Sequence, residues 1–596
     1  MRSAPKHLSR WSLPLLIGLL AACGGGSDDN STKSNPGQAT PSGNGSSTGT
    51  QPPAVIGERL NSPLCALDYV ARAPTPQQTG ADPLLRQQWF LNNTGSLDSQ
   101  ARTGEDLNLL GAWTAGKGEG VRVAIIDDAI EVTHDDLLPN VVANGSFNYL
   151  SYKHGSAYPM PCSTKDTHGT AVAGVIAARD NNRTGGAGVA PRASIVGFNA
   201  IASGADADVL DAINRDLDKN HIYNNSWGAN DDGHFYTLAP SIRKGIEHGI
   251  SQGRKGLGAI YVFAAGNGGC LTEDNAANCT GTELSTYDGH VTQLGTLAVC
   301  ATNIAGQRAS YSEPGANLLV CAPSGERDAI PMPAITTTAP QNEDTSGFNG
   351  TSAAAPMVSG VAALMLQANP NLSWRDVRLV LAQSARRVDS TSPNWTTFGG
   401  LHFNHEYGFG AADADAAVKL ARNWQSVGGS SSLRQCGPFR ASVNRSIPEN
   451  ATAMPVHPDG SVNYNARAQG GLQSAISVPA SCGITQIEHV QVNLAATGAT
   501  RSADHPDAGN LHITLTSPSG QTSTLVTPHE CVQFDVQNRA IPARCQGLQD
   551  FSTGLTRHMA EPVGTATSRD WILEAVDRNL GDSGQLSNWQ ITFYGR

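Results

Sequence analysis

Short apolar segments that end or begin at polar residues recur along the first two thirds of the chain. The run at 121–126 is continuous and rich in β-branched residues, which is typical of a buried strand, and 259–269 has a similar start. Segments 171–178 and 357–366 consist of small and branched apolar residues, and we expect each to form a buried helix. Each element meets a polar residue at one end, where rigid neighbours can hold a site.

The last third of the chain has a different pattern. After residue 424 the composition shifts to Gly and Ser, and short segments of alternating apolar and polar residues follow. Turn signals at 517–520 and 581–584 separate them, which predicts an all-β sandwich or barrel. Examples of the alternating segments are 489–494, 511–516 and 571–576.

The N-terminus has the pattern of an export signal. Arg2, Lys6 and Arg10 precede an apolar stretch at 11–22 that is too short to span a membrane. The stretch ends in Leu-Ala-Ala-Cys-Gly, which resembles the lipobox of bacterial lipoproteins and implies acylation of Cys23. An ordinary signal peptide is the alternative. Gly24 resembles the pattern of lipoproteins sent to a Gram-negative outer membrane.

The segment after Cys23 is rich in Gly, Ser, Asn and Thr up to Pro53, so it cannot bury a core. As a flexible coil of about 30 residues it would span roughly 30 Å, and we expect it to be a tether. The predicted organisation is a signal peptide at 1–22, a lipid-anchored tether and N-terminal segment at 23–81, an α/β domain at 82–424 and a β-rich domain at 430–596.

Charge and cysteine content narrow the classes of function. The 596 residues carry a net charge of −11, without a basic stripe to follow a phosphate backbone, so we expect no nucleic-acid binding. Ten cysteines remain besides Cys23, and an exported protein could pair them in five disulfides. No C-x-x-C occurs, which disfavours a zinc site. Proximity along the chain suggests the pairs 270/279, 300/321, 436/482 and 531/545, leaving 65 with 162.

Three polar residues next to the buried elements have complementary chemistry. Asp127 follows the first strand, His168 precedes a helix and Ser352 stands at the start of another. A serine hydroxyl becomes nucleophilic when an imidazole takes its proton, and a carboxylate fixes the tautomer of that imidazole. Asn267, at the end of the strand segment 259–269, could donate a hydrogen bond to an oxyanion, which typically contributes about 3 kcal/mol.

The order Asp, His, Ser, within the motifs D-D, H-G-T, A-A-G-N and G-T-S-A-A-A-P, resembles the subtilisin-like serine proteases over about residues 87–424. The resemblance implies an α/β domain with a mostly parallel sheet flanked by helices. It also implies that Ser352 attacks a peptide bond, His168 transfers the proton, Asp127 orients His168 and Asn267 holds the oxyanion. The G-x-S-x-G motif is absent around Ser352, which disfavours a lipase or esterase.

Further motifs resemble the kexin/furin branch, namely 86–91, 221–228 with the following D-D-G, and 287–289. This resemblance implies that the strand with Ser226, Trp227 and Gly228 pairs with the substrate backbone. It also implies that Asp231 and Asp288 bind a basic P1 side chain and that Asp128 reaches toward P2. Lys165 stands where the branch usually has an acid, and its charge would repel a basic P2 residue. We therefore expect a basic P1 preference and leave a dibasic rule open.

The same resemblance implies two structural calcium sites, since carboxylates and backbone carbonyls suit Ca²⁺. Solvated surface acids are the alternative for any single residue. One set is Asp106, Asp136, Asn182 and the carbonyls of Arg179, Thr184 and Gly186. The second set is Asp231, Glu283 and Glu313.

The C-terminal region resembles the P-domain that accompanies kexin-type proteases, through its motifs at 446–450, 515–520 and 584–594. We expect it to pack on the catalytic domain and stabilise it. Four of its acids could bind a further calcium, but solvated turn residues are the favoured interpretation. These acids are Asp504, Asp507, Asp577 and Asp582.

The stretch between Pro53 and Gln87 is too short for an independently folded inhibitory domain of the kind many subtilases carry. A separate chaperone or inhibitor, or maturation without one, could replace it.

We expect a calcium-stabilised, lipid-anchored serine endopeptidase of the cell envelope that acts on peptide and protein substrates. One alternative is a broad-specificity degradative subtilase whose acids serve only calcium. Another is a surface adhesin or scaffold on an inactive protease fold, which the complete set of Asp127, His168, Ser352 and Asn267 disfavours.

Overall fold

The computed structural model describes residues 75–151, 153–270, 283–326, 332–535 and 540–596. The predicted signal peptide, Cys23 and most of the predicted tether lie outside the described residues. Within them, the helix Thr351–Ala368 is long and apolar enough to cross a membrane, but 83% of its apolar window is buried inside the protein. Its apolar surface therefore serves the core of the fold.

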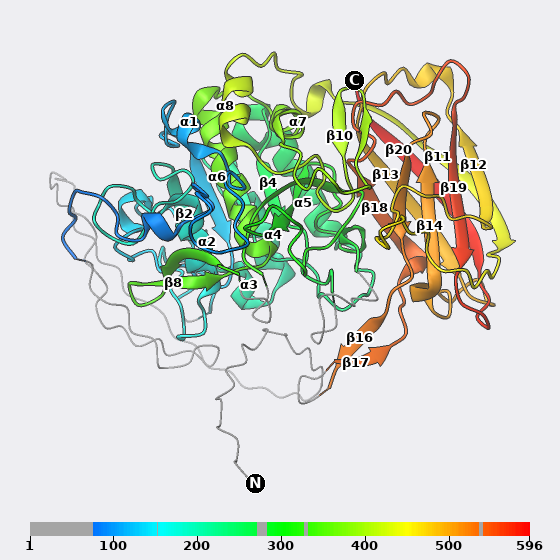
Figure 1. Ribbon diagram of the computed structural model, residues 1–596, viewed down its shortest axis with the longest axis horizontal. Coiled ribbons are helices and arrows are strands. Elements are labelled where there is room, and N and C mark those ends of the chain that lie inside the picture. Colours follow the sequence, from blue (N-terminus) through cyan, green and yellow to red (C-terminus); the bar gives the residue numbers. More distant parts are fainter. Residues whose placement is uncertain (1–74, 152, 271–282, 327–331, 536–539) are drawn as a thin grey trace, which may run out of the picture. The chain divides into compact units, whose positions relative to one another are not determined.

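A six-stranded parallel sheet forms the centre of the first domain, with the order β2-β1-β3-β4-β5-β6 (Figure 1). Nearly all of its residues are buried, which explains why its strands are continuous apolar runs in the sequence. Since all six strands run in one direction, their carboxyl ends meet at one edge, where sites form in such sheets. The strands are β1 (Arg122–Ile126), β2 (Ser194–Phe198), β3 (Ile222–Asn225), β4 (Ile260–Ala264), β5 (Thr296–Thr302) and β6 (Leu318–Pro323).

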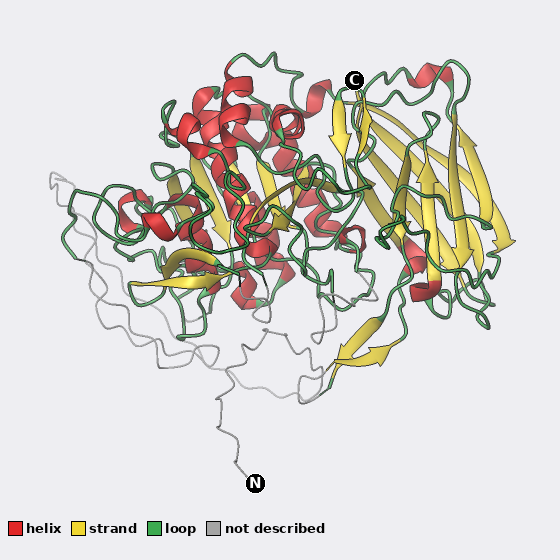
Figure 2. Ribbon diagram, in the orientation of Figure 1, coloured by secondary structure: helices red, strands yellow, loops and turns green. Residues whose placement is uncertain are grey.

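Helices surround this sheet (Figure 2). The two predicted helices are present, with earlier starts at His168 and Thr351. Apart from Ser352 and its last two residues, the longer one is buried throughout, as its small side chains permit. The helices are α1 (Leu109–Trp113), α2 (His168–Ala177), α3 (Ala200–Ser203), α4 (Asp206–Asn214), α5 (Pro240–Gln252), α6 (Thr351–Ala368), α7 (Trp374–Ser384) and α8 (Ala414–Arg422). The predicted α/β domain is confirmed.

The C-terminal domain consists of two four-stranded antiparallel sheets, with the orders β11-β20-β13-β18 and β12-β19-β14-β15. Buried Trp571, Trp589 and Phe593 belong to its hydrophobic core, which also includes Phe235 and Tyr287 of the first domain. The predicted all-β architecture is confirmed. The strands are β11 (Arg434–Ser446), β12 (Leu472–Ser477), β13 (Ile487–Thr497), β14 (Leu511–Thr516), β15 (Thr522–Val526), β18 (Phe551–Leu555), β19 (Asp570–Asp577) and β20 (Gln585–Gly595).

Three two-stranded antiparallel sheets complete the fold of the described residues. They pair β7 (Ile335–Ala339) with β8 (Glu343–Phe348), β9 (Thr396–Phe398) with β10 (Leu401–Phe403), and β16 (Cys531–Phe534) with β17 (Ala540–Ala543).

Three of the predicted disulfides are present: Cys300–Cys321 between β5 and β6, Cys436–Cys482, and Cys531–Cys545. The predicted pairs 65/162 and 270/279 each include a residue outside the described part of the chain.

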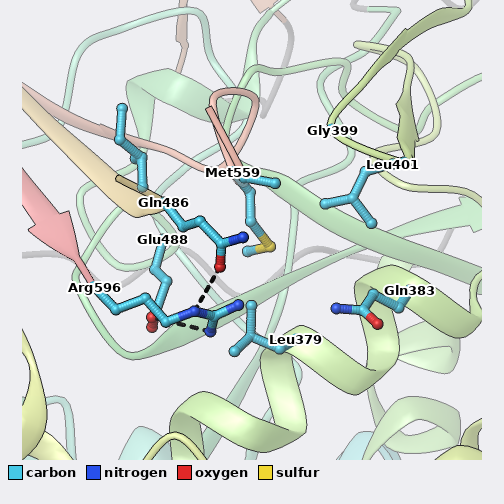
Figure 3. Close-up of a pocket in the computed structure, with 11 residues that line it drawn as sticks. Leu379, Gln383, Gly399, Leu401, Gln486, Glu488, Met559 and Arg596 are labelled. Carbon is cyan, nitrogen blue, oxygen red and sulfur yellow. Dashed lines mark hydrogen bonds and ion pairs between the residues drawn. The ribbon is translucent and has the colours of Figure 1, made fainter. Parts of the chain in front are cut away.

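Buried polar contacts join the two domains. Arg375 of α7 donates to both carboxylate oxygens of Glu488 in β13, at 2.8 and 2.6 Å. A cavity of about 280 Å³ lies beside this pair, between α7, the β9–β10 turn and the start of β13. Figure 3 shows Leu379, Gln383 and Arg596 around it, with Arg596 donating to Gln486.

The β16–β17 hairpin of the second domain bonds to a loop of the first. His529 Nε2 lies 2.8 Å from the carbonyl oxygen of Gly233, and the Val532 N–H donates to the carbonyl oxygen of Asp232 at 2.9 Å. A Cβ at Gly233 would lie 2.5 Å from the carbonyl oxygen of Glu530, so only glycine permits this approach.

Candidate active site

Asp127 follows β1 directly, and its carboxylate reaches the histidine that opens α2. Oδ1 of buried Asp127 accepts a hydrogen bond from Nδ1 of His168 at 2.8 Å. Burial lowers the pKa of His168, but the charge and hydrogen bond of Asp127, aided by Asp128, outweigh it and raise the pKa to about 9. With its Nδ1 proton held by a carboxylate, the imidazole can accept a second proton at Nε2.

Asp128 lies next to the histidine at the start of α2. Its carboxylate accepts hydrogen bonds from the backbone N–H groups of His168 (3.2 Å), Gly169 (2.8 Å) and Ala129 (2.5 Å). Burial and then the charge of Asp127 raise its pKa to about 7. Both oxygens are thus used at the start of α2, where a helix favours negative charge. This geometry shows that Asp128 helps to hold the start of α2, and its predicted contact with a P2 side chain stays a prediction.

Ser352 lies in the first turn of α6 and is bonded to the end of β3. Its Oγ donates to the carbonyl oxygen of Ser226 at 3.1 Å, and Oγ of Ser226 donates to the carbonyl oxygen of Ser352 at 3.0 Å. Among the described residues no hydrogen bond joins Ser352 to His168. The serine hydroxyl must turn from Ser226 toward the imidazole before proton transfer, a change common between free and substrate-bound sites.

Two further contacts bring the carboxylate, imidazole and hydroxyl to one region. Nε1 of Trp227 donates to the carbonyl oxygen of Ile126, the residue before Asp127, at 2.9 Å. The ring centroids of His168 and Phe348 lie 5.5 Å apart, and Phe348 is four residues before the serine. These contacts connect the segments that carry Asp127, His168 and Ser352, and the joint action of the three residues in one active site stays a prediction.

Asn267 is oriented by the start of α6. Its Oδ1 accepts hydrogen bonds from the backbone N–H and the hydroxyl of Thr351, at 2.8 and 3.0 Å. The oxygen end of the amide is therefore directed at the helix, and the Nδ2 end is the donor side. Gly350 has a φ of +82°, and a Cβ there would lie 3.4 Å from Oδ1 of Asn267. The amide is thus next to Ser352, as an oxyanion donor must be.

Asp288 lies against the segment that follows β3. Its Oδ2 accepts from the backbone N–H of Ala229 at 2.9 Å, and a Cβ at exposed Gly228 would lie 2.4 Å from that oxygen. Burial alone would raise the pKa of Asp288, but His290 and the N–H donors hold it below its usual range. A carboxylate therefore lies beside the segment predicted to pair with substrate.

Asp231, Glu283 and Glu313 form a group of acids in which the two glutamates are buried and Asp231 is half-buried. Burial and mutual repulsion raise the pKa of Glu283 and Glu313 well above the usual range, and burial raises that of Asp231. A Cβ at Gly268 would lie 2.3 Å from Glu283, and one at Gly266 would lie 2.2 Å from Glu313, so glycines leave room for these carboxylates. No lysine or arginine pairs with them in the described part of the chain. These oxygen donors fit a hard cation such as Ca²⁺.

Asp136 and Asn182 form a second group of oxygens. Asp136 accepts from Nδ2 of Asn182 at 2.7 Å and from the N–H of Gly186 at 3.3 Å. Arg179 N–H donates to the carbonyl oxygen of Asp136, and Thr184 N–H donates to Oδ1 of Asn182. The predicted members of this group, apart from Asp106, therefore lie together.

The structure places Asp82, and not the predicted Asp106, in this group. Asp106 accepts from the backbone N–H groups of Asn93 and Asn108, both at 2.7 Å, and is not among the charged groups that shift the pKa of Asp136. Asp82 instead accepts from the N–H of Asn182 at 2.9 Å. Burial, together with the charges of Asp344 and Asp82, raises the pKa of Asp136 to about 8.

The residues missed by the sequence analysis, Asp82 and Asp344, lie about 50 and 200 positions from Asp136, and no local motif connects them. Concentrated carboxylates with raised pKa values again fit a cation.

The remaining predicted residues contribute less to this region. Lys165 is exposed, and its backbone N–H donates to Ser163. In the β-rich domain buried Asp577 lies 3.3 Å from His505, which accounts for one of the four acids considered there. His529, Cys531 and Cys545 have metal-ligand atoms close together, but the two cysteines are joined in a disulfide.

Comparison with known families gives two matches. Residues 118–410 match the subtilase family, and residues 487–593 match the proprotein convertase P-domain.

Curated relatives cover 86% of this chain. A dibasic-processing endoprotease from Schizosaccharomyces pombe is 33% identical over 525 residues, and proprotein convertase subtilisin/kexin type 7 from Homo sapiens is 32% identical over 531 residues. The chain spans 65% and 60% of the length of these two relatives.

Among solved structures, the serine protease of Aeromonas sobria is similar with a TM-score of 0.71 and 26% identity, covering 91% of this chain and 99% of that protein. The same protease in complex with its chaperone is similar with a TM-score of 0.71 and 27% identity, covering 87% of this chain and 96% of that protein.

Proposed function

The chain carries a subtilase domain followed by a proprotein convertase P-domain, and from this we propose that it is a serine endopeptidase that cleaves after basic residues. The observation that carries the proposal is the 2.8 Å bond between Asp127, which follows β1, and His168, the first residue of α2.

The proposed reaction proceeds in two halves. Ser352 Oγ attacks the peptide carbonyl carbon while Nε2 of His168 takes the hydroxyl proton, and Asp127 stabilises the resulting imidazolium. Asn267 and a backbone N–H at the start of α6 donate to the oxyanion. The imidazolium then gives its proton to the leaving amine, which leaves an ester on Ser352. A water molecule, deprotonated by His168, hydrolyses the ester and restores the serine.

The preference for a basic P1 residue is supported by Asp288 and Asp231, because buried carboxylates are costly unless a cation answers them. The name of the Schizosaccharomyces pombe relative supports dibasic sites among the substrates. In this chain, however, Asp128 is engaged at α2, so the proposal requires a basic residue only at P1.

Structural calcium is part of the proposal. We propose that Asp231, Glu283 and Glu313 hold one ion and that Asp82, Asp136 and Asn182, with the carbonyls of Arg179, Thr184 and Gly186, hold another. When bound, Ca²⁺ neutralises acids that would otherwise repel one another. The ions have no part in bond cleavage.

The cellular setting is also proposed. Cys23 would carry the lipid that anchors the protein to the cell envelope, at the outer membrane. In the outer-membrane fraction, labelled fatty acid should be incorporated into the wild type but not into Cys23→Ser. The complex of the Aeromonas sobria protease with a chaperone supports a separate folding partner. The yield of active enzyme should then be higher when such a protein is co-expressed than when it is absent.

A fluorophosphonate probe and a peptide library test the activity. Covalent labelling of Ser352, together with cleavage after Arg or Lys, would support the proposal. Labelling with cleavage after apolar residues would favour a broad-specificity subtilase, and failure to label a folded protein would favour an inactive scaffold.

A further inference from the structure

His290 bonds to the acid of the proposed P1 pocket. Its Nδ1 lies 2.8 Å from Oδ1 of Asp288, and its backbone N–H donates to the same oxygen at 2.7 Å. The other oxygen of Asp288 accepts from Ala229. The imidazole therefore contacts the carboxylate from the side opposite the N–H of Ala229.

The ring of His290 is partly enclosed by uncharged aromatic side chains. Its centroid lies 5.3 Å from that of Trp227 and 6.2 Å from that of Phe263 on β4. The side chain is 22% exposed, so it can exchange protons with solvent.

The charged groups around this pair are acidic. Asp206, in the first turn of α4, attracts a proton to His290, while Asp231 and Glu283 interact unfavourably with the charge of Asp288. No lysine or arginine forms an ion pair with Asp288 in the described segments. His290 is therefore the group here that can supply a positive charge before substrate binds.

The pKa values of the two paired groups are shifted in opposite directions: that of Asp288 is lowered and that of His290 is raised. Burial lowers the pKa of His290, but the charge and hydrogen bond of Asp288 more than offset it, so that the pKa lies above its usual value near 6.5. The ring therefore keeps its proton to a higher pH than a free imidazole does.

We infer that His290 is a positioning residue that sets the charge of the P1 pocket, and thereby its preference for basic side chains. The inference rests on the proposed function. When His290 is neutral, it donates to Asp288, and the full negative charge of the carboxylate is available to a P1 cation. When His290 is protonated, the pair is neutral and the attraction for a P1 cation is lost. Binding of a basic P1 residue must therefore release a proton from His290.

Matched peptide substrates with Arg or citrulline at P1 test this inference. Citrulline has nearly the shape of Arg without its charge, and titration of His168 affects both substrates, so it cancels in the ratio of their kcat/KM values. For the wild type we expect this ratio to rise on the order of tenfold between about pH 6 and pH 9, through KM rather than kcat. His290→Asn keeps a donor that does not titrate, and its ratio should be high and constant.

His234 supplies the matched control, because its Nδ1 lies 3.1 Å from Oδ1 of Asp232, also two residues earlier. His234→Asn should retain the pH dependence of the wild type. If His290→Asn does not fold, calorimetry of benzamidine binding to the wild type in buffers of different ionisation enthalpy measures the released proton directly.

A wild-type ratio that favours Arg equally at every pH, an unchanged rise in His290→Asn, or benzamidine binding without proton release would overturn the inference while leaving the proposed function intact. A ratio near one at every pH would contradict the proposed P1 preference as well.

Discussion

Ser352 and Ser226 exchange hydrogen bonds, each hydroxyl donating to the carbonyl oxygen of the other residue at 3.1 and 3.0 Å. The nucleophile is thus held by the end of β3 before substrate arrives. Ser352→Ala removes only the hydroxyl, and we expect kcat to fall on the order of a millionfold. Cleavage of an Arg-containing reporter peptide and fluorophosphonate labelling measure the loss.

Ser359→Ala is the matched control on the same helix. Its buried hydroxyl bonds to Asn224 at 2.8 Å and is not part of the proposed reaction, so labelling should persist even if stability falls. Turnover retained by Ser352→Ala would refute the assignment of the nucleophile.

The acid partner of His168 controls both rate and pH dependence. Because His168 acts as a base when neutral, kcat/KM should rise with pH through its pKa of about 9. Asp127→Asn removes the charge that raises this pKa, so the rising limb should move to lower pH, and kcat should fall about 10⁴-fold. A pH profile measured with the citrulline substrate isolates this effect from the P1 pocket. An unmoved limb would contradict the role of Asp127.

Removal of calcium should destabilise the protein in a pH-dependent way. Glu283 and Glu313 have raised pKa values in the ion-free fold, so they stabilise it when protonated and lose that contribution as pH rises. With EGTA, Tm should be lower at pH 7.5 than near pH 5. An ion at a hundredfold excess over its Kd contributes about 2.7 kcal/mol.

For a domain of about 340 residues, such a contribution corresponds to a gain in Tm of roughly 4 °C at pH 7.5 when calcium replaces EGTA. Glu313→Gln should reduce this gain. Equal melting curves with and without calcium would exclude both sites.

Asp82 and Asp106 provide a direct comparison of two carboxylates in one region of sequence. Only Asp82 lies with Asp136 and Asn182, so Asp82→Asn should raise the calcium concentration needed for half of the Tm gain. Asp106→Asn should lower Tm equally with and without calcium, because it weakens the bonds to Asn93 and Asn108. The reverse pattern in calcium titrations would restore Asp106 as a ligand.

The Arg375–Glu488 pair is expected to hold the two domains together. Glu488→Gln leaves the buried Arg375 without a counter-charge, which typically costs about 3–5 kcal/mol. Urea unfolding measures the change. Lys419→Ala breaks the exposed pair with Asp415 and should change the free energy of unfolding by less than about 1 kcal/mol. Similar decreases in the free energy of unfolding of both variants would show that the interdomain pair contributes no more to stability than an exposed pair does.

The parts of the site that follow buried strands or precede helices were predictable from sequence. An apolar segment adjoins each of Asp127, His168 and Ser352. The strand or helix and its adjacent polar residue could therefore be predicted from the same stretch of sequence. The disulfides 300/321, 436/482 and 531/545 also follow proximity along the chain.

Contacts between distant segments were not predictable in this way. Asp82 reaches Asn182 across 100 positions, and Asp128 meets the start of α2 about 40 positions later. Two aspartates look alike in the sequence. Only the folded structure therefore shows that Asp82, and not Asp106, lies next to Asn182. The Asp288–His290 pair is local, and its spacing of two residues could have indicated it.

The bonds from His529 and Val532 to the loop of Asp232 and Gly233 have a practical consequence. In a protein that ends near residue 424, this loop and its neighbour Asp231 would lack the hydrogen-bond partners that the C-terminal domain supplies. We therefore expect the truncated protein to lose substrate selectivity as well as solubility. A truncated variant would first need substitutions that replace the lost contacts to the loop.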